Sequence, residues 1–385
     1  VCWAQQIDLQ GQVYILNSLY QTGQIKYVEG AAIQAAFAGE TRSDADGQFG
    51  LTFSGLENGS LVDLTVEKAG LEVVNERDVL NVVLGRKQPL KIFLAPQGEL
   101  AQRQTELYEV SLAALTAKQD ALIASLRAGG VESTRTIEEL EQQLNRELEH
   151  RYEAENIIRE QLEATKERLP EMVKRLAEVN LDFASAIYRS AYEAYLAGDI
   201  SRALDLLDEE QLSATADVIV AALSGIQEGQ QDFQLAVEAE LEKASQVYES
   251  YALKADAYEL IFDYQNAAEV RQKGVALLEA VKEGEDLELA DAYGALALVL
   301  ERSGQYYDAL ETQLKATSIF EDLLSFDDSS LIAAYSGLAR GPGAGGRGPR
   351  RGPADAPGHP QDGAADFDPQ KTRNLGALED ESAHP

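Results

Sequence analysis

Residues 290–316 have the sequence ADAYGALALVLERSGQYYDALETQLKA, and they carry the clearest structural signal in the chain. Small residues stand at Ala297, Ala309 and Ala316, where they let two antiparallel helices approach each other closely. Gly304 lies between the two apolar stretches and suits the left-handed conformation that ends many helices. The stretch therefore predicts a helical hairpin that turns at Gly304.

This hairpin belongs to a pattern that repeats every 42 residues. Self-similarity at a fixed period indicates stacked units that bury their apolar faces against each other. The recurring positions are Tyr251, Tyr293 and Tyr335; Ala255, Ala297 and Ala339; Tyr264 and Tyr306; Ala267 and Ala309; and Leu277 and Ile319.

The array is irregular in two respects. Phe262 stands where Gly304 would align, so the middle unit lacks the expected glycine. A more divergent unit lies upstream, and its spacing from Gly198 to Ala203 equals that from Gly304 to Ala309. However, Gly198 and Phe262 are 64 residues apart, which is more than one period.

The repeated pattern resembles the tetratricopeptide repeat in its longer, kinesin light-chain-like form. The resemblance implies an α-α repeat solenoid over 184–339, with a concave groove that binds proteins or peptides. The candidate groove residues are Tyr188, Tyr192 and Tyr195, which form an i, i+4, i+7 stripe, together with Asp291 and Glu301. The alternative for the three tyrosines is packing against the preceding helical segment, and we favour it.

The N-terminal part of the chain has the alternation of strands. Its short β-branched or alternating runs are separated by glycines, as expected for strands joined by turns. Asp46-Gly47 lies between two such runs and predicts a hairpin, because a tight turn needs a positive φ that glycine adopts without strain. The runs, at 12–16, 31–37, 49–53, 61–66 and 90–94, predict a small antiparallel β-sandwich.

The order of these runs resembles the carboxypeptidase regulatory-like, or transthyretin-like, domain. The matching segments are 11–13, 28–33, Thr41, 44–49 and 64–71. The resemblance implies a β-sandwich over 7–97 that serves as an accessory module of exported proteins and has no catalytic residues. A calcium loop beginning at Asp44 is the alternative to a turn there, but its twelfth position is Gly55, which has no carboxylate to bind the ion.

Residues 100–182 show the period of a helix. The Gly129-Gly130 pair interrupts the apolar stripe, and Pro170 suits the first turn of another helix. We expect a helical hairpin or a loose coiled coil whose charged faces are solvated. The stripe consists of Leu107, Val110, Ala114, Leu115, Leu122, Leu126, Ile137, Leu140, Leu144, Leu148, Ile158 and Leu162.

Composition limits the kinds of binding partner and of active or metal site that are expected. The 385 residues include 66 acidic and 33 basic ones, and the net charge of −33 repels nucleic acids and anionic lipids. Partners are therefore expected to be proteins or peptides, with basic surfaces favoured. With one cysteine and three histidines, we predict no catalytic residues, no metal and no cofactor. No apolar run approaches the roughly 18 residues that a membrane-spanning helix needs.

The first residues suggest export. Residues 1–4, VCWA, are typical of the end of a signal segment that is cleaved after Ala4. The protein is then expected to be periplasmic or associated with the cell envelope. An arbitrary fragment start is the alternative.

The last residues, 340–385, break with the array. Glycine, proline and arginine suddenly dominate, a composition that cannot form a packed core. Two interpretations compete, a disordered tail and a reading-frame or assembly error, and the second is favoured because the change falls inside a repeat. If the reading frame or assembly was lost near Arg340, the apolar stripe of Leu331, Ile332, Tyr335 and Leu338 would be covered only by the preceding helix.

Together these features predict a non-enzymatic scaffold of the cell envelope that binds protein partners through helical repeats. Nothing in the sequence indicates an oligomeric state. Two alternatives remain open: an accessory polysaccharide- or cell-wall-binding protein that acts through the β-sandwich, and the sensory part of a signalling protein truncated at its C-terminus.

Overall fold

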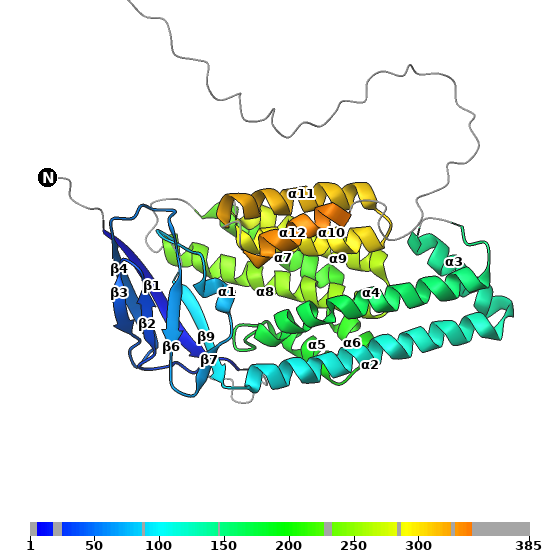
Figure 1. The fold of residues 1–385 in the computed structure, drawn as a ribbon, viewed down its shortest axis with the longest axis horizontal. Helices are drawn as coiled ribbons and strands as arrows, with labels where there is room; N and C mark the ends of the chain where they lie inside the picture. The colour runs from blue at the N-terminus through cyan, green and yellow to red at the C-terminus, as the bar shows by residue number, and fades with distance from the viewer. Residues whose placement is uncertain are drawn as a thin grey trace, which may run out of the picture. The chain divides into compact units, whose positions relative to one another are not determined.

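The computed structural model describes residues 6–17, 25–86, 89–144, 147–226, 233–282, 286–324 and 328–340. A sheet-rich N-terminal region is followed by a helical region (Figure 1). The last strand, β9, ends at Pro96 and the first long helix, α2, begins at Glu99. Before this point the only helix in the described residues is α1 (Glu76–Val79), and after it the described residues contain no strand. The predicted order of strands and then helices is confirmed.

The strands form three small sheets around one apolar core. Their orders are β4-β1-β9-β7, β3-β2-β6 and β5-β8. Strand β4 alternates strictly, with Phe49, Leu51 and Phe53 buried and their neighbours exposed. The strands are β1 (Gln6–Ile15), β2 (Ala32–Ala35), β3 (Gly39–Arg42), β4 (Gln48–Ser54), β5 (Leu61–Val62), β6 (Leu64–Glu67), β7 (Leu71–Val73), β8 (Val82–Val83) and β9 (Leu90–Pro96).

Two expectations for this region need correction. The pairing is not wholly antiparallel, because β1 and β9 run parallel, from Gly11 opposite Leu90 to Ile15 opposite Leu94. The long connection between these two strands makes the parallel pairing possible.

The turn at Asp46-Gly47 forms, but it does not close a hairpin. Gly47 has a φ of 73°, and the Asp44 carboxylate accepts hydrogen bonds from the backbone N–H groups of Asp46 (3.0 Å) and Gln48 (2.8 Å). The flanking strands β3 and β4 belong to different sheets, and β4 pairs with β1 instead. Val13 N–H donates to the Gly47 carbonyl (2.9 Å), so the turn also lies close against β1.

The helical region begins with a long hairpin and continues with pairs of helices. Helices α2 and α4 lie side by side, joined through α3 (Figure 1). Pro170 does not open a helix as expected but lies inside α4. The helices are α2 (Glu99–Ala128), α3 (Gly130–Leu144), α4 (Arg151–Glu178), α5 (Ala186–Leu196), α6 (Ile200–Leu206), α7 (Glu209–Gly225), α8 (Phe233–Leu260), α9 (Tyr264–Val281), α10 (Leu287–Arg302), α11 (Tyr306–Leu323) and α12 (Ser329–Arg340).

Three of the helix pairs turn through the same backbone geometry. The residues at these turns, Gly198, Phe262 and Gly304, have φ values of 76°, 63° and 81°. Phe262 N–H donates to the Glu259 carbonyl, and Gly304 N–H donates to the Glu301 carbonyl, both at 3.1 Å. The middle unit therefore keeps the left-handed turn although a bulky residue replaces the glycine.

A short segment after α4 contacts the sheet region. Leu181 N–H donates to the Asn17 carbonyl (3.0 Å), and the Asn17 side chain donates to Asp182 (2.9 Å). The rings of Tyr14 and Phe183 meet edge to face, with their centroids 5.0 Å apart.

Among the described residues no helix is long and apolar enough to cross a membrane.

Candidate interaction site

The three tyrosines predicted for a groove lie on α5 and are fully buried. Tyr192 Oη accepts hydrogen bonds from Arg103 Nε (3.1 Å) and Nη2 (2.9 Å). Tyr195 Oη lies 2.7 Å from Ser111 Oγ, and Tyr188 stacks on Tyr192. Because Arg103 and Ser111 belong to α2, these side chains pack against the preceding helical segment and are not open to a partner. Burial raises the pKa of all three tyrosines.

Asp291 and Glu301 lie on α10 in different surroundings. Asp291 pairs with Arg77 of α1, whose guanidinium also lies over the Phe320 ring, 5.7 Å from its centroid. Burial raises the pKa of Asp291, and the charge of Arg77 opposes this shift. Glu301 is exposed in the last turn of α10. The three tyrosines therefore pack as the favoured alternative expected, and the five candidate groove residues are divided between a buried core, a contact with the sheet region and an exposed position at the end of α10.

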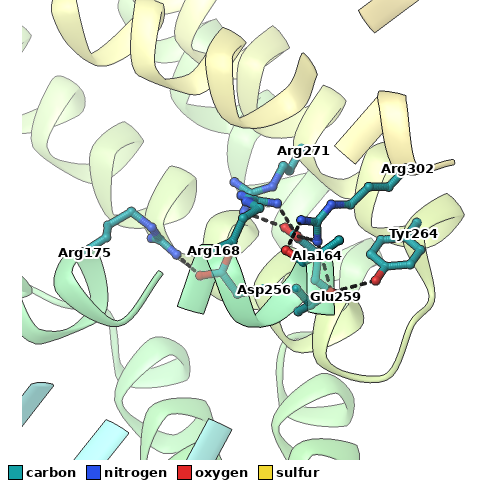
Figure 2. A network of polar contacts seen from close by, with 9 residues as sticks. Ala164, Arg168, Arg175, Asp256, Glu259, Tyr264, Arg271 and Arg302 are labelled. Atoms are coloured by element: carbon teal, nitrogen blue, oxygen red, sulfur yellow. Dashed lines mark hydrogen bonds and ion pairs between the residues drawn. The ribbon is translucent and has the colours of Figure 1, made fainter. Parts of the chain in front are cut away.

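A buried network of charges joins α4 to the repeats, and sequence analysis did not predict it (Figure 2). Arg168 and Arg175 are seven residues apart on one face of α4, and Asp256 and Glu259 share a face of α8. We expected the charged faces of the 100–182 segment to be solvated. This expectation is wrong for Arg168, which retains only 11% of its side-chain exposure.

Glu259 is the centre of the network. Its side chain is completely buried and pairs with Arg168 of α4, with Arg271 Nη2 of α9 (3.1 Å) and with Arg302 Nη1 of α10 (3.8 Å). Burial acts to raise the pKa of Glu259, but the three guanidinium groups together hold it below its ordinary value. Glu259 is therefore ionised and bound on several sides.

The network extends in both directions from Glu259. Asp256 is equally buried and pairs with Arg271 Nη2 (2.5 Å) and with Arg175. Arg175 Nη1 also donates to Glu249 (2.9 Å).

On the other side, Arg302 Nη1 donates to Thr165 Oγ1 (3.0 Å) and its Nη2 donates to the Ala164 carbonyl (2.5 Å). Thr165 Oγ1 lies 2.7 Å from Tyr264 Oη. Four helices are thus bound by one set of contacts.

The chemistry of this cluster favours structure over reaction. Each of the three carboxylates accepts from at least one guanidinium, so each is occupied as an ion-pair partner instead of acting as a base. Groups of three or more potential ligand residues that could hold a metal ion are absent from the described residues. The network holds helix α4 against residues 259–264, where α8 turns into α9. This turn between the two helices of a unit is called a corner below.

The corresponding corner in the next unit is open. Tyr306 and Tyr307, at the start of α11, are exposed, and Tyr307 keeps 89% of its accessible surface. Glu301, just before this corner, is exposed as well. Further exposed apolar side chains lie on the last two described helices, namely Leu310 and Leu314 on α11 and Ile332 and Tyr335 on α12.

No protein-family model, curated protein or solved structure matches this chain.

Proposed function

We propose that this chain is a non-enzymatic scaffold that binds protein partners through its helical repeats. One observation carries the proposal: the repeat unit already holds a helix at one corner, and the same corner recurs uncovered 42 residues later. At the inner corner, Glu259 and Tyr264 contact Arg168 and Thr165 of α4.

The uncovered corner has the same residue types in the same places. Glu301 corresponds to Glu259, and Tyr306 corresponds to Tyr264. Both outer residues are exposed. A partner helix that carries an arginine would supply the charge that Arg168 supplies to Glu259, and a net charge of −33 favours such basic partners.

The finer assignments belong to the same proposal. The array is interpreted as tetratricopeptide-like, since its helices are packed in pairs and its turns recur at Gly198, Phe262 and Gly304. The sheet region is interpreted as a carboxypeptidase regulatory-like sandwich, and the protein as an exported component of the cell envelope. These assignments rest on the sequence resemblances and on the VCWA segment.

Site-specific photo-crosslinking tests the proposal. A photoreactive phenylalanine is placed at Tyr307, and in a control protein at Tyr152, which is also exposed but lies on α4 outside the array. We expect defined protein adducts from position 307 in extracts of the cells that make the protein, and none of the same adducts from position 152. Each identified partner is then purified and its affinity for the unmodified chain is measured.

A charge reversal at Glu301 tests whether the exposed corner binds the crosslinked partner. Glu301→Arg is expected to weaken the partner's binding at least ~10-fold, the effect of about 1.4 kcal/mol that a desolvated charge pair readily provides. Glu171→Arg, at an exposed site on α4, is the matched control and is expected to leave binding unchanged. If position 307 gives no adduct, or if both reversals act equally, the array does not bind partners through this corner.

A further inference from the structure

We propose that the C-terminal end of the array binds an amphipathic α-helix of a partner protein, which packs on α12 as the second helix of its pair. This site is distinct from the corner at Glu301 and Tyr306, and the inference goes beyond the function proposed above. It rests on the register of α8, α10 and α12, which are the first helices of successive units, and of α9 and α11, which are the second helices.

A repeated hydrogen bond fixes this register. Tyr293 of α10 donates to Glu279 of α9, and Tyr335 of α12 donates to Glu321 of α11 (2.6 Å). Donor and acceptor are each displaced by 42 residues. Helix α12 therefore packs on α11 as α10 packs on α9.

The second helix of each unit covers a defined face of the first. In the inner unit, a methyl group added at Gly274 of α9 would lie 3.3 Å from the Tyr248 ring and 3.4 Å from Tyr251 Cβ. Tyr248 and Tyr251 thus face α9. In the next unit, Lys315 of α11 lies over the Tyr293 ring, 5.7 Å from its centroid.

The same face of α12 is exposed. Tyr248 and Tyr251 keep 9% and 2% of their accessible surface, and Ala290 and Tyr293 keep 0% and 8%. Their counterparts Ile332 and Tyr335 keep 53% and 38%. The face that a second helix covers in α8 and α10 thus carries two exposed apolar side chains in α12, and no second helix among the described residues packs on it.

The composition of the residues after α12 does not predict this second helix. One period after α11 come residues 348–365, which contain Pro349, Pro353, Pro357 and Pro360. A proline in a helix interior removes a backbone hydrogen bond and clashes with the preceding turn, so four within 18 positions predict no helix there. We therefore assign the position to a helix of another protein.

The packing defines the chemistry of that helix. Gly274 and Ala316 occupy equivalent positions in α9 and α11, and both are buried beside the first helix. The partner helix needs glycine or alanine where it passes Ile332 and Tyr335, with apolar residues on either side. Its outer flanks are expected to be basic, because α11 carries Asp308, Glu311, Glu321 and Asp322 against one lysine, Lys315.

The test uses the full chain and a synthetic probe. The probe has the sequence of α11 (Tyr306–Leu323) with its four acidic residues replaced by lysine, to give it the expected basic flanks. It is stapled on its outer face to keep it helical, and it carries a fluorophore. We expect saturable binding by fluorescence anisotropy, weakened at least ~10-fold by Ile332→Asp in the protein. A similar loss is expected when the probe's Ala316 is replaced by leucine, because a larger side chain overpacks the contact. Val218→Asp, at an exposed apolar site on α7, is the control and is expected to change nothing.

Each other outcome overturns the inference. A probe that does not bind at about 1 mM, or binds Ile332→Asp as well as the unmodified protein, shows that this face does not accept a helix. A chain that sediments as a dimer, and becomes monomeric on Ile332→Asp, shows that a second copy occupies the face. Failure here leaves the proposed function intact if the partner crosslinked at position 307 still depends on Glu301, because the two sites are mutated separately.

Discussion

Two corners of the repeat array, at residues 259–264 and 301–306, have the same residue types at their ends but opposite environments. Glu259 and Tyr264 keep 0% and 1% of their accessible surface, whereas Glu301 is exposed and Tyr306 keeps 49%. The difference comes from α4, which crosses the first corner and contributes Arg168 and Thr165. Burial at a repeat position is therefore decided by the helix that covers it and not by the residue that occupies it.

The largest effect on the free energy of unfolding is expected when the glutamate of each corner is replaced. Glu259→Ala leaves Arg168 and Arg302 without their buried carboxylate and leaves Arg271 with Asp256 alone, and removing one partner of a buried ion pair costs about 3–5 kcal/mol. Glu301→Ala is the matched control and is expected to change the free energy of unfolding by less than about 0.5 kcal/mol. Urea denaturation measures both, and equal losses would contradict the difference described between the corners.

The next effect concerns the turn residue of each corner. Phe262→Gly relieves a positive φ that costs a bulky side chain about 1–2 kcal/mol, but it removes a ring that is 99% buried. Loss of a buried phenylalanine costs about 3–5 kcal/mol, so we expect a net destabilisation of about 2–3 kcal/mol. Gly304→Ala is expected to cost only about 1 kcal/mol, since it introduces strain without removing a side chain. A stabilised Phe262→Gly protein in urea denaturation would show that the strain outweighs the packing.

Features that depend on local sequence could be predicted, whereas contacts that depend on the tertiary position of a helix could not. The packed helix pairs, the turn at Gly304 and the change from strands to helices near Pro96 follow from local signals, and they could be predicted. The ion network could not, because Arg168 and Arg175 alternate with other charges along α4 and are typical of a solvated helix face. Only the tertiary position of α4 shows that these two arginines reach Asp256 and Glu259.

The candidate groove illustrates the same point. Tyr188, Tyr192 and Tyr195 have the spacing of one helix face, which predicts that they act together but not whether the face is open. Arg103 and Ser111, about 80 to 90 residues earlier in the chain, close it. Ile332 and Tyr335 are exposed, as the prediction of a stripe covered only by the preceding helix implies, whereas Leu331 of the same stripe is buried.

A smaller effect is expected on the pH dependence of stability, and it arises at the end of α4. Burial raises the pKa of Glu178, in the last turn of α4, to about 7, with Lys174 opposing the shift and Asp78 and Glu76 adding to it. Since the raised pKa favours the protonated carboxyl in the folded protein, the stability it contributes is present at low pH and is lost as pH rises through 7. Between pH 6 and 8 we expect the unmodified protein to lose about 1 kcal/mol more than Glu178→Gln. Parallel pH profiles of the two proteins would contradict this.

The smallest effect compares the two tyrosine hydroxyls. Tyr264→Phe removes the hydrogen bond to Thr165 and is expected to cost about 0.5–1 kcal/mol. Tyr306→Phe is the control at the exposed corner and is expected to leave the thermal midpoint unchanged. A larger loss from Tyr306→Phe would mean that the outer corner is covered in solution.

Hydrogen–deuterium exchange of the full chain tests most directly the claim that α12 has an open, helix-accepting face. We expect amides over 331–338 of α12 to exchange at least ~10-fold faster than their counterparts over 289–296 of α10, because local opening costs less where one side of a helix is uncovered. Addition of the stapled α11 probe is expected to slow exchange over 331–338 and to leave 289–296 unchanged. Equal exchange in the two helices without the probe, or no response of α12 to it, would contradict the claim.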